Sequence, residues 1–176
     1  MSKNKNKTKR GFSLLEVLIA IFIIIVGFSG SVALIVKTIR LSSLSVSRLR
    51  AAYLAQEGAE LIRNVRDTNW LQIRQGDDVD WDEGLSNHCP GSGFIVDYTY
   101  SGQLNPDFPC YSGQFLRIDN NGFYNYSSGQ VTKFQRKITI NKIDDDTIGV
   151  LVEVFWKEHG KNYSFSLQEN LYNWLP

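Results

Sequence analysis

The sequence predicts an α+β fold in which the second half of one long N-terminal helix packs on a C-terminal antiparallel β-sheet. Three patterns along the 176 residues predict this fold. An uncharged apolar run comes first, an amphipathic stretch without proline follows, and short segments of alternating polarity fill the second half of the chain. We therefore expect a helix whose first half spans a membrane and whose second half covers a sheet.

The apolar run extends from Val17 to Val36, 20 residues without a charge. Wound as an α-helix, such a run covers the ~30 Å hydrocarbon core of a bilayer. We expect residues 12–36 to form one transmembrane helix. Five basic residues and no acid lie between positions 3 and 10. Although four basic residues also follow the span, this denser cluster predicts a cytoplasmic N-terminus and an outward-facing remainder.

Residues 37–66 are expected to continue the helix as its amphipathic half, which ends at Asp67-Thr68-Asn69. Gly58 is expected to be only a mild penalty within it. The apolar residues that can share the sheet-facing side are Ile35, Ile39, Leu49, Tyr53, Ala59, Ile62 and Val65. The polar residues expected largely on other sides are Arg48, Arg50, Gln56, Glu60, Arg63 and Arg66.

Residues 67–176 are expected to form a globular, β-rich region outside the membrane, beginning with a connecting loop at 71–93. The expected strands are Phe94–Tyr100, Gln114–Asp119, Phe123–Tyr126, Phe134–Ile140, Ile148–Trp156 and the alternating segment 163–167. Asn120-Asn121-Gly122 is a hairpin turn signal between the second and third of these. The last three segments are expected to form a meander with short turns.

Charge and cysteine content indicate the surroundings of this outer region. Without residues 1–11 the chain has 14 basic and 18 acidic residues, a net charge of −4. The remaining basic residues form no long cluster, so no nucleic-acid partner is expected. Outside the membrane, Cys89 and Cys110 would lie in an oxidising compartment, where a separation of 21 positions suits one disulfide. Two unrelated buried thiols are the alternative.

No set of residues suggests catalysis, so the chain is not expected to be an enzyme, and no cofactor or metal is expected. His88 could in principle bind zinc with the two cysteines, but the usual ligand spacings are missing. In the acidic segment 77–84, alternate aspartates resemble a calcium loop. The glycine comes one residue late and the bidentate glutamate is missing, so a solvated acidic loop is the simpler interpretation.

The junction between the basic and apolar segments carries the most information. A possible cleavage position, Gly11–Phe12, lies before the apolar run, whereas secretory signals are cut after it. Glu16 follows four residues later on the same helix face as Phe12. An acid costs about 2.5–3.5 kcal/mol at the centre of a membrane helix, so it needs a partner. Cutting after Gly11 would create an amine at Phe12 that could meet Glu16 of a neighbouring chain.

The sequence Lys9-Arg10-Gly11-Phe12-Ser13-Leu14-Leu15-Glu16, followed by an unbroken apolar helix, resembles the class III leader of type IV prepilins and pseudopilins. The resemblance implies that residues 1–11 are a cytoplasmic leader peptide. It implies cleavage between Gly11 and Phe12 and N-methylation of Phe12 by a prepilin peptidase/methyltransferase, and a role for Glu16 in assembly and register. Major pilins often carry a proline in this helix, whereas this chain has Gly27 and Gly30.

A second segment, residues 51–60 continuing to Trp70, resembles minor pilins of the PilV-like group. The two resemblances together imply a minor pilin-like structural subunit of a type IV pilus or its priming complex. Its implied partners are membrane lipid before assembly, other pilin subunits through their N-terminal helices, and the pilus assembly machinery. The implied location is a single-pass cytoplasmic (inner) membrane protein that enters a cell-surface filament.

Two alternatives remain open at this stage. A pseudopilin of type II secretion or competence would have the same leader. A single-span membrane-anchored extracytoplasmic binding module would use the helix only as a tether, and its N-terminus would stay intact.

Overall fold

The computed structural model describes residues 11–85, 89, 91–100 and 108–174. It contains α1 (Leu14–Gln75), a 3₁₀ turn (Tyr98–Tyr100), β1 (Phe115–Ile118), β2 (Tyr124–Asn125), β3 (Gln130–Asp144), β4 (Thr147–Glu158) and β5 (Lys161–Tyr172). The strands form one antiparallel sheet in the order β2-β1-β3-β4-β5. The expected α+β fold is confirmed. The chain divides into two compact units, Met1–Ser45 and Val46–Pro176.

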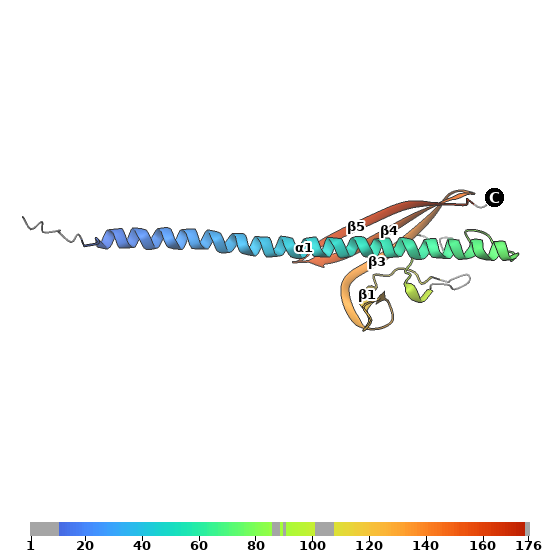
Figure 1. Ribbon diagram of the computed structural model, residues 1–176, viewed down its shortest axis with the longest axis horizontal. Coiled ribbons are helices and arrows are strands. Elements are labelled where there is room, and N and C mark those ends of the chain that lie inside the picture. Colours follow the sequence, from blue (N-terminus) through green and yellow to red (C-terminus); the bar gives the residue numbers. More distant parts are fainter. Residues whose placement is uncertain (1–10, 86–88, 90, 101–107, 175–176) are drawn as a thin grey trace, which may run out of the picture. The chain divides into compact units, whose positions relative to one another are not determined.

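The long strand β3 connects the two parts of the sheet. Its second half pairs with β4, and its first half pairs with the short strand β1, so β3 curves between them (Figure 1). The β4–β5 turn consists of His159 and Gly160, both with positive φ, at 48° and 80°. Two such residues form the turn that matches the twist of a tight hairpin. The expected meander is therefore present, with strands longer than predicted.

The hairpin expected around Asn120-Asn121-Gly122 is also present. Strands β1 and β2 pair antiparallel. The carboxylate of Asp119 accepts the backbone N–H groups of Asn121 and Phe123, and these bonds lower its pKa. Gly122 has a φ of 88°, which favours glycine. Asp119 and Gly122 thus fix a turn that the sequence signalled.

The outer part of α1 packs through a face rich in small residues. The buried residues are Ser47, Ala51, Leu54, Ala55, Gly58, Ala59, Ile62, Val65, Arg66, Asn69 and Trp70. They recur at helical spacing, and they face β-strand residues such as Ile138 and Val152. The sequence-based assignment of this face was partly wrong. Leu49 and Tyr53 are 57% and 63% exposed, whereas Arg66 is buried.

Gly58 has a larger role than expected. A β-carbon placed there would lie 3.0 Å from Val152 Cγ1, 3.1 Å from Arg136 Cδ and 3.3 Å from Ile138 Cδ1. These distances are tighter than ordinary van der Waals contacts. The helix therefore approaches the sheet more closely at Gly58 than any side chain there would comfortably allow.

The helix does not end at Arg66, as the sequence suggested, but continues to Gln75. Asn69 and Trp70 are buried in the added turns, and the amide of Asn69 donates to the carbonyls of Trp81 and Glu83. This tertiary contact outweighs the weak helix propensity of Asp67-Thr68-Asn69. The true end is Gly76, at φ 93°, where the N–H of Asp77 bonds to the carbonyl of Gln72.

The strand expected at Phe94–Tyr100 is not formed. Phe94 makes isolated bridges to Cys110 and Ile138, and residues 98–100 form the 3₁₀ turn. The carboxylate of Asp97 accepts bonds from the N–H and hydroxyl of Thr99 and from the N–H of Tyr126. An aspartate that bonds the backbone two residues later favours a turn over a strand.

Candidate functional site

The predicted cleavage junction lies just before α1. Gly11, Phe12 and Ser13 have no regular secondary structure, and the helix begins at Leu14. Residues 1–10 of the predicted leader lie outside the described residues. Phe12 is 81% exposed, and a β-carbon at Gly11 would meet nothing within 4 Å. Among the described residues, no packing contact therefore requires a glycine at position 11.

Glu16 lies in the first turn of α1 and is exposed. A carboxylate near a helix N-terminus interacts favourably with the unpaired N–H groups there. Among the described residues, no ion pair includes Glu16. Within the described ranges, this acid therefore has a helix terminus but no cationic partner.

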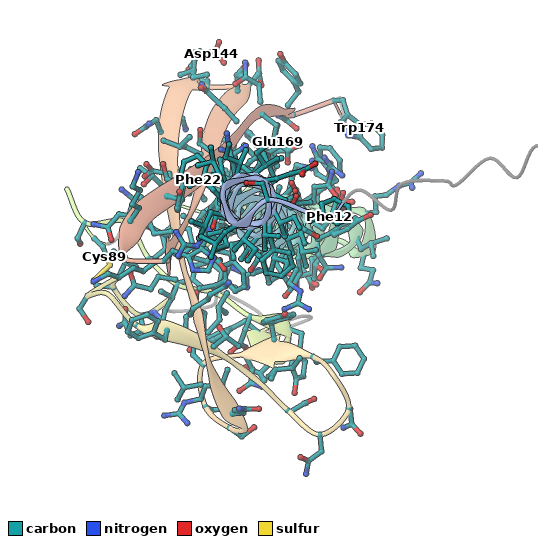
Figure 2. The ribbon with its side chains drawn as sticks, turned by 90° about the vertical axis from the view of Figure 1, so that its left-hand side faces the viewer. Phe12, Phe22, Cys89, Asp144, Glu169 and Trp174 are labelled. Carbon is teal, nitrogen blue, oxygen red and sulfur yellow. A yellow bond between two sulfur atoms is a disulfide. The ribbon has the colours of Figure 1, made fainter. Side chains whose placement is uncertain are left out.

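The first unit presents an apolar helix surface with no protein to cover it. The structure has one helix, α1, long and apolar enough to cross a membrane, and no residue of its most apolar window is buried. Phe22, labelled in Figure 2 with Phe12, is 67% exposed. The hydroxyls of Ser29, Ser31 and Thr38 each donate to the carbonyl four residues earlier. Such bonds satisfy polar groups without leaving the helix, as a lipid environment requires.

The two glycines of this span have no packing role among the residues that the structure describes. A β-carbon at Gly27 or Gly30 would meet nothing within 4 Å, and α1 continues through both positions. Small residues leave a membrane helix with a low surface that another helix can approach closely.

In the second unit, Cys89 and Cys110 form a disulfide with a Cα–Cα distance of 5.6 Å, visible as a yellow bond beside the Cys89 label in Figure 2. His88, the third candidate zinc ligand, lies outside the described residues. No group of three or more His, Cys, Asp or Glu side chains gathers around a possible metal position within the described ranges.

The acidic segment is held against the β3–β4 turn. Asp82 Oδ2 is 3.3 Å from Lys142 Nζ, and the indole N–H of buried Trp81 donates to the carbonyl of Asp145.

The sequence analysis missed two buried polar groups that join α1 to the sheet. Arg136 is fully buried and donates to the carbonyls of Leu54 and Val96, at 2.9 and 2.6 Å, with Glu57 Oε1 3.3 Å away. Its position midway between Phe134 and Ile138 places it on the apolar side of β3, a signal that was available in the sequence.

The second group lies at the start of the packed part of α1. The hydroxyl of buried Ser47 donates to Glu158 Oε2 at 2.7 Å, and Lys133 Nζ donates to both of them. Glu158 is only 8% exposed, so its charge depends on these partners. No local sequence pattern predicts this cluster, because Ser47, Lys133 and Glu158 are far apart in the sequence and come together only in the folded chain.

Comparison with known proteins finds one family match. The description "Prokaryotic N-terminal methylation motif" fits residues 6–32, which include the Gly11–Phe12 junction, Glu16 and the first part of the span. No curated protein and no solved structure matches the chain. The match supports a type IV pilin-like or pseudopilin-like protein, a class of structural subunits that a prepilin peptidase processes and that assembles with other pilins.

Proposed function

We propose that this chain is a minor pilin-like structural subunit, inserted in the membrane, cleaved between Gly11 and Phe12, methylated on Phe12, and incorporated into a type IV filament or its priming complex. The observation that carries the proposal is the methylation motif at residues 6–32 on an exposed junction, followed by an apolar helical segment in which no residue from Phe12 to Ser42 is buried. A leader removed ahead of the span leaves that helix on the mature subunit, where other helices can cover it.

Glu16 is the residue on which assembly would depend. Its carboxylate lies within an apolar surface and has no cationic partner among the described residues of its own chain. In lipid, such an acid is costly until it is neutralised or paired. Cleavage after Gly11 would supply the missing cation as the methylated amine of Phe12 on a neighbouring chain. One pair per subunit would fix the axial register.

The proposed role of Glu16 is tested by replacing it with glutamine and alanine in cells that assemble the filament. Both variants should insert and lose the leader normally, because cleavage precedes pairing, but the amount in the sheared filament fraction should fall at least tenfold. Asp78→Asn, which removes an exposed acid from the outer region, is the matched control and should assemble normally. Normal incorporation of both Glu16 variants would refute the pairing.

Intact mass measurement of the mature protein tests the processing step separately. Loss of residues 1–11 and addition of one methyl group are expected. An intact N-terminus would instead favour a single-span binding module. A type II secretion or competence pseudopilin would show the same processing. Crosslinking the chain in cells and identifying the subunits that co-purify with it would distinguish a pseudopilin from a pilus subunit.

A further inference from the structure

A cavity of about 470 Å³ opens on the second unit, mostly on the face of the sheet that points away from α1. It is lined by Tyr111, Phe115, Lys133, Gln135, Lys137, Phe155, Trp156, Lys157, Asn162 and Tyr163. Its size lies within the range of small-molecule sites, which are typically aromatic with a few polar groups. Neither the cleavage junction nor the membrane helix uses this cavity.

The aromatic wall of the cavity is held in place before any ligand binds. Tyr111 follows disulfide-bonded Cys110, its N–H bonds to the carbonyl of Gly93 at 3.0 Å, and its hydroxyl lies 3.3 Å from Gln135 Oε1. The ring is 6.4 Å from that of Phe155. Because its main chain and its hydroxyl are both fixed, Tyr111 presents a ring without a further ordering cost.

The charges around the cavity favour an anionic ligand. Its lining includes three lysines and no acid. Lys133 is paired with Glu158, and Lys137 Nζ is 2.5 Å from Glu153 Oε2. Lys157 is exposed and takes part in no ion pair within the described part of the chain. An incoming carboxylate would therefore meet one ammonium group that has no competing partner.

The neighbouring edge strand indicates the kind of ligand. Asn162 lines the cavity and is paired with Lys157, and Ser164 is paired with Phe155. From there, the same face of β5 continues as a row of exposed, uncharged residues: Asn162, Ser164, Ser166, Gln168 and Asn170. Hydroxyl and amide groups suit a chain rich in hydroxyls. A nucleic acid would need cations along its phosphates, and this row has none.

We propose that the cavity binds an acidic sugar residue of an oligosaccharide, with its carboxylate at Lys157 and its ring against Tyr111 and Phe155. The following sugars would lie along the polar row of β5. The site is independent of filament assembly, so it stands even if the proposed role of Glu16 fails.

Titration calorimetry of the full-length chain in lipid nanodiscs tests the proposal, with trigalacturonate as the acidic probe. The neutral trisaccharide galactotriose, a hexa-aspartate peptide and an eight-residue oligothymidylate are the comparison probes. Trigalacturonate should bind, and each comparison probe should bind at least tenfold more weakly. Lys157→Gln should weaken trigalacturonate binding by about tenfold, the loss of one charge-assisted hydrogen bond.

Two further variants make the result specific. Lys161→Gln removes the same charge from an exposed position outside the cavity and should leave binding unchanged. Tyr111→Leu should weaken the binding of trigalacturonate while the disulfide still forms. The proposal is overturned if trigalacturonate does not bind, if Lys161→Gln weakens binding as much as Lys157→Gln, or if the peptide or the oligonucleotide binds as well as the acidic sugar.

Discussion

Arg136, at the centre of β3, donates a 2.9 Å hydrogen bond to the main-chain carbonyl of Leu54 in α1. It is fully buried, and its second donor group reaches the carbonyl of Val96. One side chain therefore joins the helix, the sheet and the segment that precedes the 3₁₀ turn.

Arg136→Met should destabilise the outer region by about 2–4 kcal/mol, because it removes two buried hydrogen bonds to main-chain carbonyls while keeping much of the side-chain volume. Denaturant unfolding of the detergent-solubilised chain, followed by tryptophan fluorescence, measures the change. Arg48→Met, at an exposed position of α1, is the control and should shift stability by less than about 0.5 kcal/mol. Equal stability of the two variants would contradict a joining role for Arg136.

Gly58→Ala should lower stability by about 1–3 kcal/mol, although alanine is ordinarily the better helix former by about 1 kcal/mol. The reason is the 3.0 Å approach of the added β-carbon to Val152 Cγ1. The same unfolding measurement checks it. Gly27→Ala is the control: its added β-carbon meets nothing within 4 Å, so the free energy of unfolding should not fall. A Gly58→Ala variant that is more stable than the native chain would contradict the prediction and show that the sheet can move away at this position.

Tyr126 should make the outer region less stable at high pH. Burial raises its pKa from 10.0 to about 12, and its hydroxyl donates to the carbonyl of Arg136. The folded state therefore favours the neutral phenol. The resulting stabilisation is complete below pH 10, the unfolded value, and is lost as the pH rises towards 12.

Tyr126→Phe provides the comparison for this pH effect. Near neutral pH it should be less stable than the native chain by about 1 kcal/mol, the value of one hydrogen bond. Between pH 10 and 12 the native chain should lose about 2 kcal/mol more than the variant. Unfolding curves of both chains across this range measure the difference, and parallel curves would rule out Tyr126 as the source.

Gly11→Val should block leader removal without affecting the folding of the chain, since a side chain at position 11 meets nothing within 4 Å. The expected product is a membrane-inserted protein that keeps its leader, detected by intact mass. Gly30→Val, also a position with open space, should still be processed. Normal cleavage of Gly11→Val would place the processing position elsewhere.

The sequence predicted those parts of the fold that depend on local pattern. The apolar run, the meander and the hairpin at Gly122 each follow from residue periodicity or turn chemistry, and they are present. The predicted helix end at Arg66 failed because Asn69 gains partners, the Trp81 and Glu83 carbonyls, from a distant segment. The predicted strand at Phe94–Tyr100 failed because Asp97 bonds its own neighbours.

The candidate sites divide in the same way. The cleavage junction and Glu16 are contiguous in sequence, so their pattern could be read directly. The cavity proposed to bind an acidic sugar combines Tyr111 with Lys157 and Asn162, which meet only because β4 pairs with both β3 and β5 in particular registers. Leu49 and Tyr53 were assigned to the buried side of α1 from the spacing of apolar residues, whereas the residues that pack on the sheet include the small residues Ala51, Ala55 and Gly58.

The exposure of every side chain from Phe12 to Ser42 has a thermodynamic consequence for the proposed assembly. This segment has no interior of its own, so its transfer from lipid into a filament exchanges one apolar solvent for another. Hydrophobic free energy nearly cancels in such a partition, which leaves close packing and polar pairing to determine its direction. A subunit of the proposed kind would move either way between membrane and fibre at a modest cost, and the pairing of one carboxylate would shift the balance.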